Sequence, residues 1–216
     1  MRGVDGSTTV EQEILAAVVA ASTPHAETRL IRQLRNVGTV ASIPMLRLLA
    51  TDARDPGVRV AAVRAVTAIG GQSAIDALIQ VVATTRDDVT LFWAARGLGQ
   101  QKAWGAVPTL TDRLATHGVA GTRLARTALV KALWAVPHRT ATPVLARHLA
   151  DDDRTTRRLA AAALARIGTP EADSALRQAA ETMPWWRGRF ARRALSFREK
   201  RLAAADQHVE TDEADP

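Results

Sequence analysis

The densest group of residues able to bind a ligand lies near the C-terminus, where arginines alternate with aromatic side chains. Residues 184–204 read PWWRGRFARRALSFREKRLAA, with a helical spacing. A helix that carries arginines beside Trp and Phe can bind phosphates, an anionic membrane or an acidic protein surface. The same pattern fits a capping helix whose apolar side covers the preceding element. The residues predicted to bind a partner here are Trp185, Trp186, Arg189, Arg192 and Arg193.

The other polar residues form no catalytic or metal-binding pattern. The five histidines are isolated, and none has a second His four residues away or an adjacent Glu. Asp151, Asp152 and Asp153 could bind a cation, but they stand where a helix is expected to begin, and helix capping explains them better. The sequence contains no cysteine, no phosphate-binding Gly-rich loop and no zinc motif. We therefore expect no catalytic residue, no metal and no cofactor.

A repeated pair of short amphipathic helices supplies the elements that position these side chains. A helical apolar period in residues 58–69 is followed by a Gly-Gly turn and a second period in residues 74–82. The pattern recurs at spacings of 32, 32, 35 and 31 residues. Its turn positions are Gly38, Gly70, Lys102, Pro137 and Gly168. Because one helix pair cannot bury its apolar face alone, we predict that successive pairs stack.

The repeat also carries a family resemblance. Residues 55–59 (DPGVR), the run AAVRAVTAIG that ends at Gly70, and residues 74–78 resemble HEAT repeats of the short type found in phycobilisome lyases. The resemblance covers roughly residues 25–182. It implies an all-α fold, namely a right-handed α-solenoid of about five HEAT-like helix pairs with a capping helix at each end, about twelve helices in all. In such repeats, residues equivalent to Asp55 and Arg59 link successive pairs, so we assign them a structural role.

The expected boundaries follow from the repeat. We predict a disordered N-terminus at residues 1–7, a single solenoid domain at 8–205 and an acidic disordered tail at 206–216. Within the domain, the helix pairs are expected at 25–53, 55–86, 87–118, 121–150 and 153–182. The last eleven residues hold five acidic residues and no Lys or Arg, a composition typical of disorder.

Two kinds of position in the repeat predict a binding surface. The second helices of such a solenoid usually line its concave face, and their polar positions are Arg47, Asp112, Arg113, Arg147, His148 and Arg177. Trp104 and Trp134 replace residues that are mostly non-apolar in the other pairs, so we expect them to be exposed interface anchors. On the first helices, Arg32, Arg64, Arg96 and Lys131 form a basic row that breaks at Ala162. We interpret this row as a solvated face.

Composition narrows the class of protein. The formal net charge is +7, carried mostly by arginine, which favours an acidic partner. The absence of cysteine indicates a reducing compartment. The N-terminal sequence MRGVDGSTTVEQ has no apolar signal-peptide core, and the longest apolar run has eight residues. We therefore expect a cytoplasmic protein.

These observations predict a non-catalytic scaffold or adaptor that binds another protein, with an acidic surface, through its concave face and its basic C-terminal helix. Three other classes stay open. One is a nucleic-acid-binding protein, because some DNA glycosylases are built of HEAT-like repeats and Trp104, Asp112, Arg113 and Arg147 have suitable chemical types. The second is recruitment to an anionic membrane surface. A chromophore-lyase subunit is also open, because the repeat resembles those proteins, although no residue points to pigment chemistry.

Overall fold

The computed structural model describes residues 5–117 and 122–212, and the side chains of residues 9–116 and 122–204. These residues form twelve α-helices and four short 3₁₀ helices, and no strand occurs among them. The predicted all-α solenoid is confirmed. The chain divides into two compact units, Met1–Ala132 and Leu133–Pro216.

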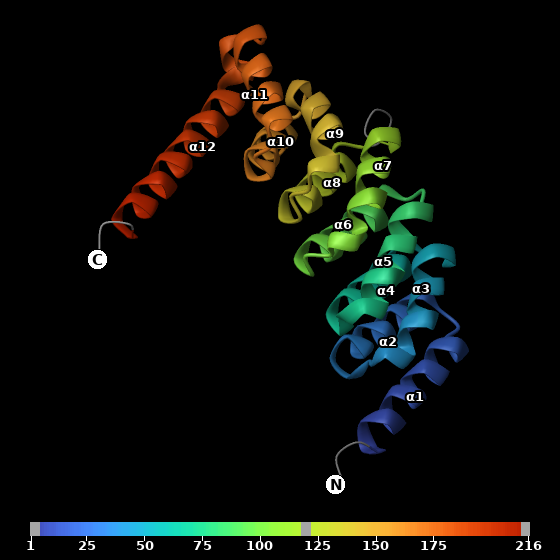
Figure 1. Cartoon of the computed structure of the whole chain (residues 1–216). Coiled ribbons are helices and arrows are strands. Elements are labelled where there is room, and N and C mark those ends of the chain that lie inside the picture. Colours follow the sequence, from blue (N-terminus) through green and yellow to red (C-terminus); the bar gives the residue numbers. More distant parts are fainter. Residues whose placement is uncertain (1–4, 118–121, 213–216) are drawn as a thin grey trace. The chain divides into compact units, whose positions relative to one another are not determined.

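Unit 1 consists of one helix followed by stacked helix pairs (Figure 1). Its helices are α1 (Asp5–Ala20), α2 (Pro24–Val37), α3 (Ile43–Asp52), α4 (Pro56–Ile69), α5 (Gly71–Thr84), α6 (Asp88–Gln100) and α7 (Val107–His117), and α8 (Arg123–Ala135) crosses into unit 2. The first helices of the pairs, α2, α4 and α6, pack side by side in one layer, while α3, α5 and α7 form the other. The pairs therefore fall at the positions that the sequence repeat predicts.

Local signals in the sequence set the beginnings of these helices. Asp55 caps α4 by accepting a hydrogen bond from the Val58 amide at 3.1 Å, and Asp87 caps α6 in the same way. Between the caps, the apolar positions of each pair face inward, and the leucines of the repeat are fully buried. A solenoid core of this kind needs only neighbouring pairs to exclude water.

Arg59 links two successive pairs in unit 1. Its Nη1 donates to the carbonyl of Ala53 at 2.8 Å, and its Nη2 lies 3.5 Å from Asp87 of the next pair. Both side chains of the ion pair are mostly buried. The role of Asp55 and Arg59 is therefore structural, one as a helix cap and the other as an inter-pair link.

Unit 2 contains the end of α8 and the helices that follow it in the chain. Its further helices are α9 (Thr142–Arg147), continued by a 3₁₀ turn at His148–Ala150, then α10 (Arg154–Ile167), α11 (Pro170–Thr182) and α12 (Trp185–Asp212). Helix α12 packs against both α10 and α11. It therefore takes the place of the first helix of a further pair.

Arg198 fastens α12 to the turn between α10 and α11. Its Nε donates to Asp173 at 2.8 Å, and its Nη2 donates to the Gly168 carbonyl. Gly168 adopts a left-handed conformation, φ 68°, that ends α10. A β-carbon at this position would clash with the end of the Arg198 side chain, so any larger residue forces that guanidinium to shift.

The chain ends differ from the expected boundaries. Helix α1 already includes residues 5–7, and α12 continues through 206–212, so these residues are helical where disorder was expected. At the N-terminal end, Glu11 fixes α1 by accepting hydrogen bonds from Thr39 and Ser42. At the C-terminal end, the alanines at 203–205 favour helix continuation. Residues 1–4 and 213–216 lie outside the described part, and the single domain at 8–205 stays a prediction.

Candidate functional site

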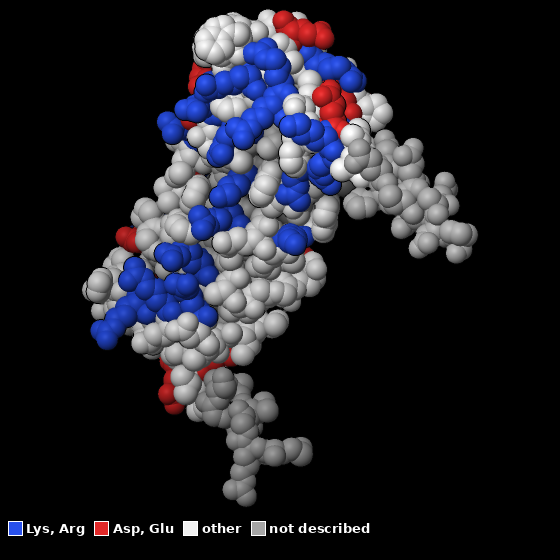
Figure 2. Space-filling view, turned by 90° about the vertical axis from the view of Figure 1, so that its left-hand side faces the viewer, with Lys and Arg blue, Asp and Glu red and all other residues white. Residues whose placement is uncertain are grey.

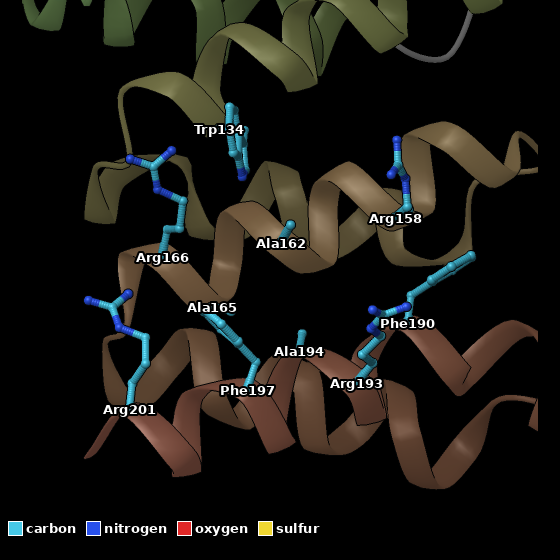
Figure 3. A pocket seen from close by; sticks show the side chains of 10 residues that line it. All are labelled: Trp134, Arg158, Ala162, Ala165, Arg166, Phe190, Arg193, Ala194, Phe197 and Arg201. Carbon is cyan, nitrogen blue, oxygen red and sulfur yellow. The ribbon is translucent and has the colours of Figure 1, made fainter. Parts of the chain in front are cut away.

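A groove of about 500 Å³ lies between α10 and α12 in unit 2 (Figure 3). We call it the α10–α12 groove. Its volume falls within the range of ligand sites. The lining residues are Trp134, Arg158, Ala162, Ala165, Arg166, Phe190, Arg193, Ala194, Phe197 and Arg201.

The groove has a basic region at each end and an apolar middle. Figure 3 shows Arg158 and Arg193 at one end, and Arg166 and Arg201 at the other. The alanines and Phe197 lie between them. On each helix the two arginines are eight residues apart, which is about 12 Å along the helix axis. Helices α10 and α12 run in the same direction, so Arg158 stands at the same end of the groove as Arg193, and Arg166 at the same end as Arg201, while the Arg158 and Arg166 side chains extend toward the side where Trp134 lies.

Small residues on both helices leave the floor of this groove open. Ala162 is half-buried, while Ala165 and Ala194 are buried. Ala162 occupies the position that a basic residue (Arg32, Arg64, Arg96 or Lys131) holds in the other first helices. An apolar side chain therefore lies on the groove floor where those helices carry a cation. The clasp formed by Arg198, Gly168 and the Asp173 carboxylate holds α12 in place.

Aromatic rings lie close to several of the guanidinium groups. The Arg166 guanidinium lies 4.7 Å from the centroid of the Trp134 ring, and that of Arg189 lies 4.8 Å from the Phe190 ring. These distances are within the range of cation–π attraction, which holds the arginines near the ring faces. Phe197 is 58% exposed although it lines the groove. An exposed phenyl ring between arginines offers a partner both apolar area and charge.

The groove carries an uncompensated positive charge. No Asp or Glu lines it, and among the described side chains none forms an ion pair with Arg158, Arg166, Arg193 or Arg201. Four guanidinium groups around an apolar surface create a positive potential that attracts an anionic ligand. The site thus combines exposed apolar area with positive charge that no lining carboxylate neutralises.

The structure brings only two of the predicted partner-binding residues into this groove, Trp134 and Arg193. The others lie elsewhere. In unit 2, the exposed residues outside it are Arg147, Arg177, Trp185, Trp186 and Arg189. In unit 1, Trp104 and Asp112 are exposed and Arg47 is half-buried. Binding by these residues stays a prediction.

Three predicted binding residues make contacts within the fold, and binding by Arg113 and Arg192 stays a prediction. His148 is buried, and its Nδ1 lies 2.9 Å from the Val144 carbonyl, so it is not part of a surface. Arg113 donates to the Thr85 carbonyl at the end of α5. Arg192 donates to the Ala180 carbonyl at 2.7 Å, at the end of α11. Both arginines satisfy carbonyl groups that helix ends leave free.

Sequence reasoning missed the two arginines that α10 contributes. We assigned the binding surface to the second helices and to the basic C-terminal helix, whereas α10 is a first helix within the repeat. The signal was present in Arg158 and Arg166, four residues on either side of Ala162, where the basic row breaks. Arg193 and Arg201 repeat the eight-residue spacing on α12.

In unit 1, two arginines of the basic row lie against an aromatic ring, although we expected the row to be a solvated face. The guanidinium groups of Arg64 and Arg96 lie 4.8 and 5.5 Å from the ring centroid of Trp93, which is half-buried. Figure 2 shows Lys and Arg gathered on the face where α2, α4 and α6 lie.

Neither a metal site nor a membrane span is found in the described part of the chain. Within residues 5–117 and 122–212, no three His, Cys, Asp or Glu residues form a group that could hold a metal ion. No helix in these ranges has both the length and the apolar character that crossing a membrane requires.

A family model described as HEAT repeats matches residues 12–99 and 108–196. The chain belongs to the HEAT-repeat family. The matched residues include all five helix pairs and the first part of α12. A search of curated proteins finds no match to this chain.

Solved structures of HEAT-like and armadillo-like proteins share the fold of this HEAT-repeat protein. The complex of CpcE and CpcF of phycocyanin lyase from Nostoc sp. PCC7120 is 20% identical, with a TM-score of 0.58 over 82% of this chain and 74% of that chain. A designed armadillo repeat protein in complex with the peptide (KR)4 is 17% identical, with a TM-score of 0.56 over 87% and 98% of the two chains. At these identities the likeness establishes the fold alone.

Proposed function

We propose that this HEAT-repeat protein is a non-catalytic scaffold that binds an acidic protein partner through the α10–α12 groove. One observation carries the proposal. Four arginines surround an apolar, partly aromatic floor, and no carboxylate among the lining residues neutralises them. Exposed aromatic rings and arginines are the residue types that contribute most to binding energy at protein interfaces.

The fold supports a binding role rather than catalysis. HEAT-like solenoids present extended surfaces to partners. One structural neighbour is itself a two-protein complex, and another holds the peptide (KR)4. That peptide is basic, whereas the groove here is basic itself, so its partner must carry the opposite charge. The cytoplasmic location expected from the sequence stays a prediction.

Charge reversal on opposite walls of the groove tests the proposal. Tagged wild-type protein and the double variant Arg158→Glu/Arg193→Glu are used to capture partners from a native lysate, with and without nuclease. The matched control is Arg147→Glu/Arg177→Glu, which changes the net charge equally at exposed positions on α9 and α11. Circular dichroism establishes that all three proteins keep the same helix content.

We expect an acidic protein to be captured by the wild type and the control, and to be lost from the groove variant. Loss from the control variant alone would instead assign binding to the second helices and refute the groove. Capture that disappears on nuclease treatment of the wild type would show a nucleic-acid ligand and contradict the scaffold. Equal capture by all three proteins would also refute the proposal.

A further inference from the structure

We infer that the segment bound in the α10–α12 groove is an amphipathic helix with an acidic residue at each end of an apolar stripe. This inference rests on the proposed function and specifies the partner. It follows from the spacing of the arginines, from the chemistry of the groove floor and from the direction of the two walls.

The spacing of the arginines matches the rise of a helix. Arg158 and Arg166 are eight residues apart on α10, and Arg193 and Arg201 are eight residues apart on α12. Acidic residues at i and i+8 of a bound helix are separated by the same distance, about 12 Å. A helix lying along the two parallel walls therefore brings one carboxylate near the two arginines at each end of the groove.

The floor favours a helix over an extended peptide. The middle of the groove is formed by Ala162, Ala165, Ala194 and Phe197, whose side chains offer no hydrogen-bonding group. An extended chain on this floor leaves part of its backbone without partners, which is costly away from water. A helix satisfies its own backbone and presents only side chains. Apolar residues at i+1, i+4 and i+7 lie on the same face as the two acids.

The arrangement of unit 2 also leaves room for such a helix. On α12, Phe197 and Leu202 are exposed, Phe197 by 58% and Leu202 by 52%. The partner helix covers the Phe197 side of this surface.

Synthetic peptides test the register directly, with the full-length protein and fluorescence anisotropy as the measurement. The register peptide has 16 residues, Glu at i and i+8, and Leu at i+1, i+4 and i+7. A face-swapped peptide of the same composition carries its two Glu residues at i+2 and i+6, on the opposite side of the helix. A third peptide keeps every interacting residue but has Pro at i+5, which blocks the helix.

We expect the register peptide to bind at least tenfold more tightly than the face-swapped and the proline peptides. Its affinity should fall at least tenfold for Arg158→Glu/Arg193→Glu, and equally for Arg166→Glu/Arg201→Glu at the other end. The variant Arg147→Glu/Arg177→Glu should bind it like the wild type.

Equal binding of the three peptides would overturn the inference, because charge alone would then explain it. Stronger binding of the proline peptide would show an extended partner and would also overturn it. A single-stranded oligonucleotide that displaces the register peptide at equal charge concentration would assign the groove to nucleic acid. Capture of an acidic protein by the groove, together with no preference for the register peptide, would leave the scaffold standing and refute only the helical occupant.

Discussion

The contact between Arg198 and Gly168 gives a quantitative test of how α12 is held. Gly168 needs its left-handed φ of 68° to end α10, and Arg198 lies directly over it. Each residue therefore limits what can replace the other. A β-carbon on Gly168 would come within 2.1 Å of Arg198 Nη1, so the Gly168→Ala variant must displace the arginine.

The structure allows the two costs to be estimated. Arg198→Ala removes a charge-assisted hydrogen bond to Asp173 and one to the Gly168 carbonyl, and partial exposure of the pair reduces the loss to about 2–3 kcal/mol of unfolding free energy. Gly168→Ala adds a left-handed alanine, about 1–2 kcal/mol, to the displacement of the same arginine, so its cost is about 3–5 kcal/mol. The double variant should also cost about 3–5 kcal/mol, because Arg198 is lost only once.

Urea unfolding of the four proteins, followed by circular dichroism, measures this coupling. Hydrogen exchange of the α12 amides shows whether the loss is local to that helix. Gly71→Ala is the matched control: Gly71 has φ 80°, and a β-carbon there meets no atom within 4 Å. The loss of unfolding free energy in Gly71→Ala should come from backbone strain alone. It should add to the loss caused by Arg198→Ala, with no coupling between the two. Full additivity of Gly168→Ala and Arg198→Ala, within about 0.5 kcal/mol, would refute the steric reasoning.

Three further variants test other parts of the fold. Burial opposes the charge of Glu11, but hydrogen bonds from Ser42 and Thr39 outweigh it and lower its pKa below the ordinary 4.5. Glu11→Gln should therefore lower the free energy of unfolding by about 1–2 kcal/mol at pH 7. Urea titrations should show that the difference from the wild type shrinks as the pH falls below 4.5 through the lower folded-state pKa. A difference that stays constant with pH would contradict this reasoning. Lys102 has φ 49° at a turn position, so Lys102→Gly should raise the melting temperature through a net gain of roughly 0.5–1 kcal/mol, and a fall would refute this account. Ala162→Phe should fill the groove floor and abolish register-peptide binding at unchanged net charge; unaltered affinity would show that the ligand does not reach the floor.

The sequence alone determined the repeat, because each pair is defined locally. A cap residue, an apolar helical period and a turn residue all lie within about thirty positions, so their spacing is visible without any tertiary information. The backbone at the turn was not predictable from this alignment: Lys102, Gly70 and Gly168 have positive φ, whereas Gly38 at the equivalent position has φ −67°.

The chain termini were harder to predict. The acidic composition of residues 206–216 indicated disorder, yet α12 extends to Asp212. Composition reports whether a segment can bury apolar area, whereas a helix that is already anchored continues with little cost per residue. The anchor, the clasp of Arg198 on Gly168, joins residues 30 positions apart and is invisible to a local pattern.

Only the tertiary structure decided which arginines are available to a partner. Arg113, Arg192 and Arg193 have the same chemistry and lie on helix faces that the sequence shows as polar. Packing directs the first two toward carbonyl groups at the ends of neighbouring helices, whereas Arg193 faces the groove. The helical period of a sequence predicts which side of the helix is polar. Whether an arginine on that side meets the end of another helix or a wall of the groove is decided by residues far away in the chain. The groove exists because α10 and α12 meet through alanines, and only their packing brings the two pairs of arginines together.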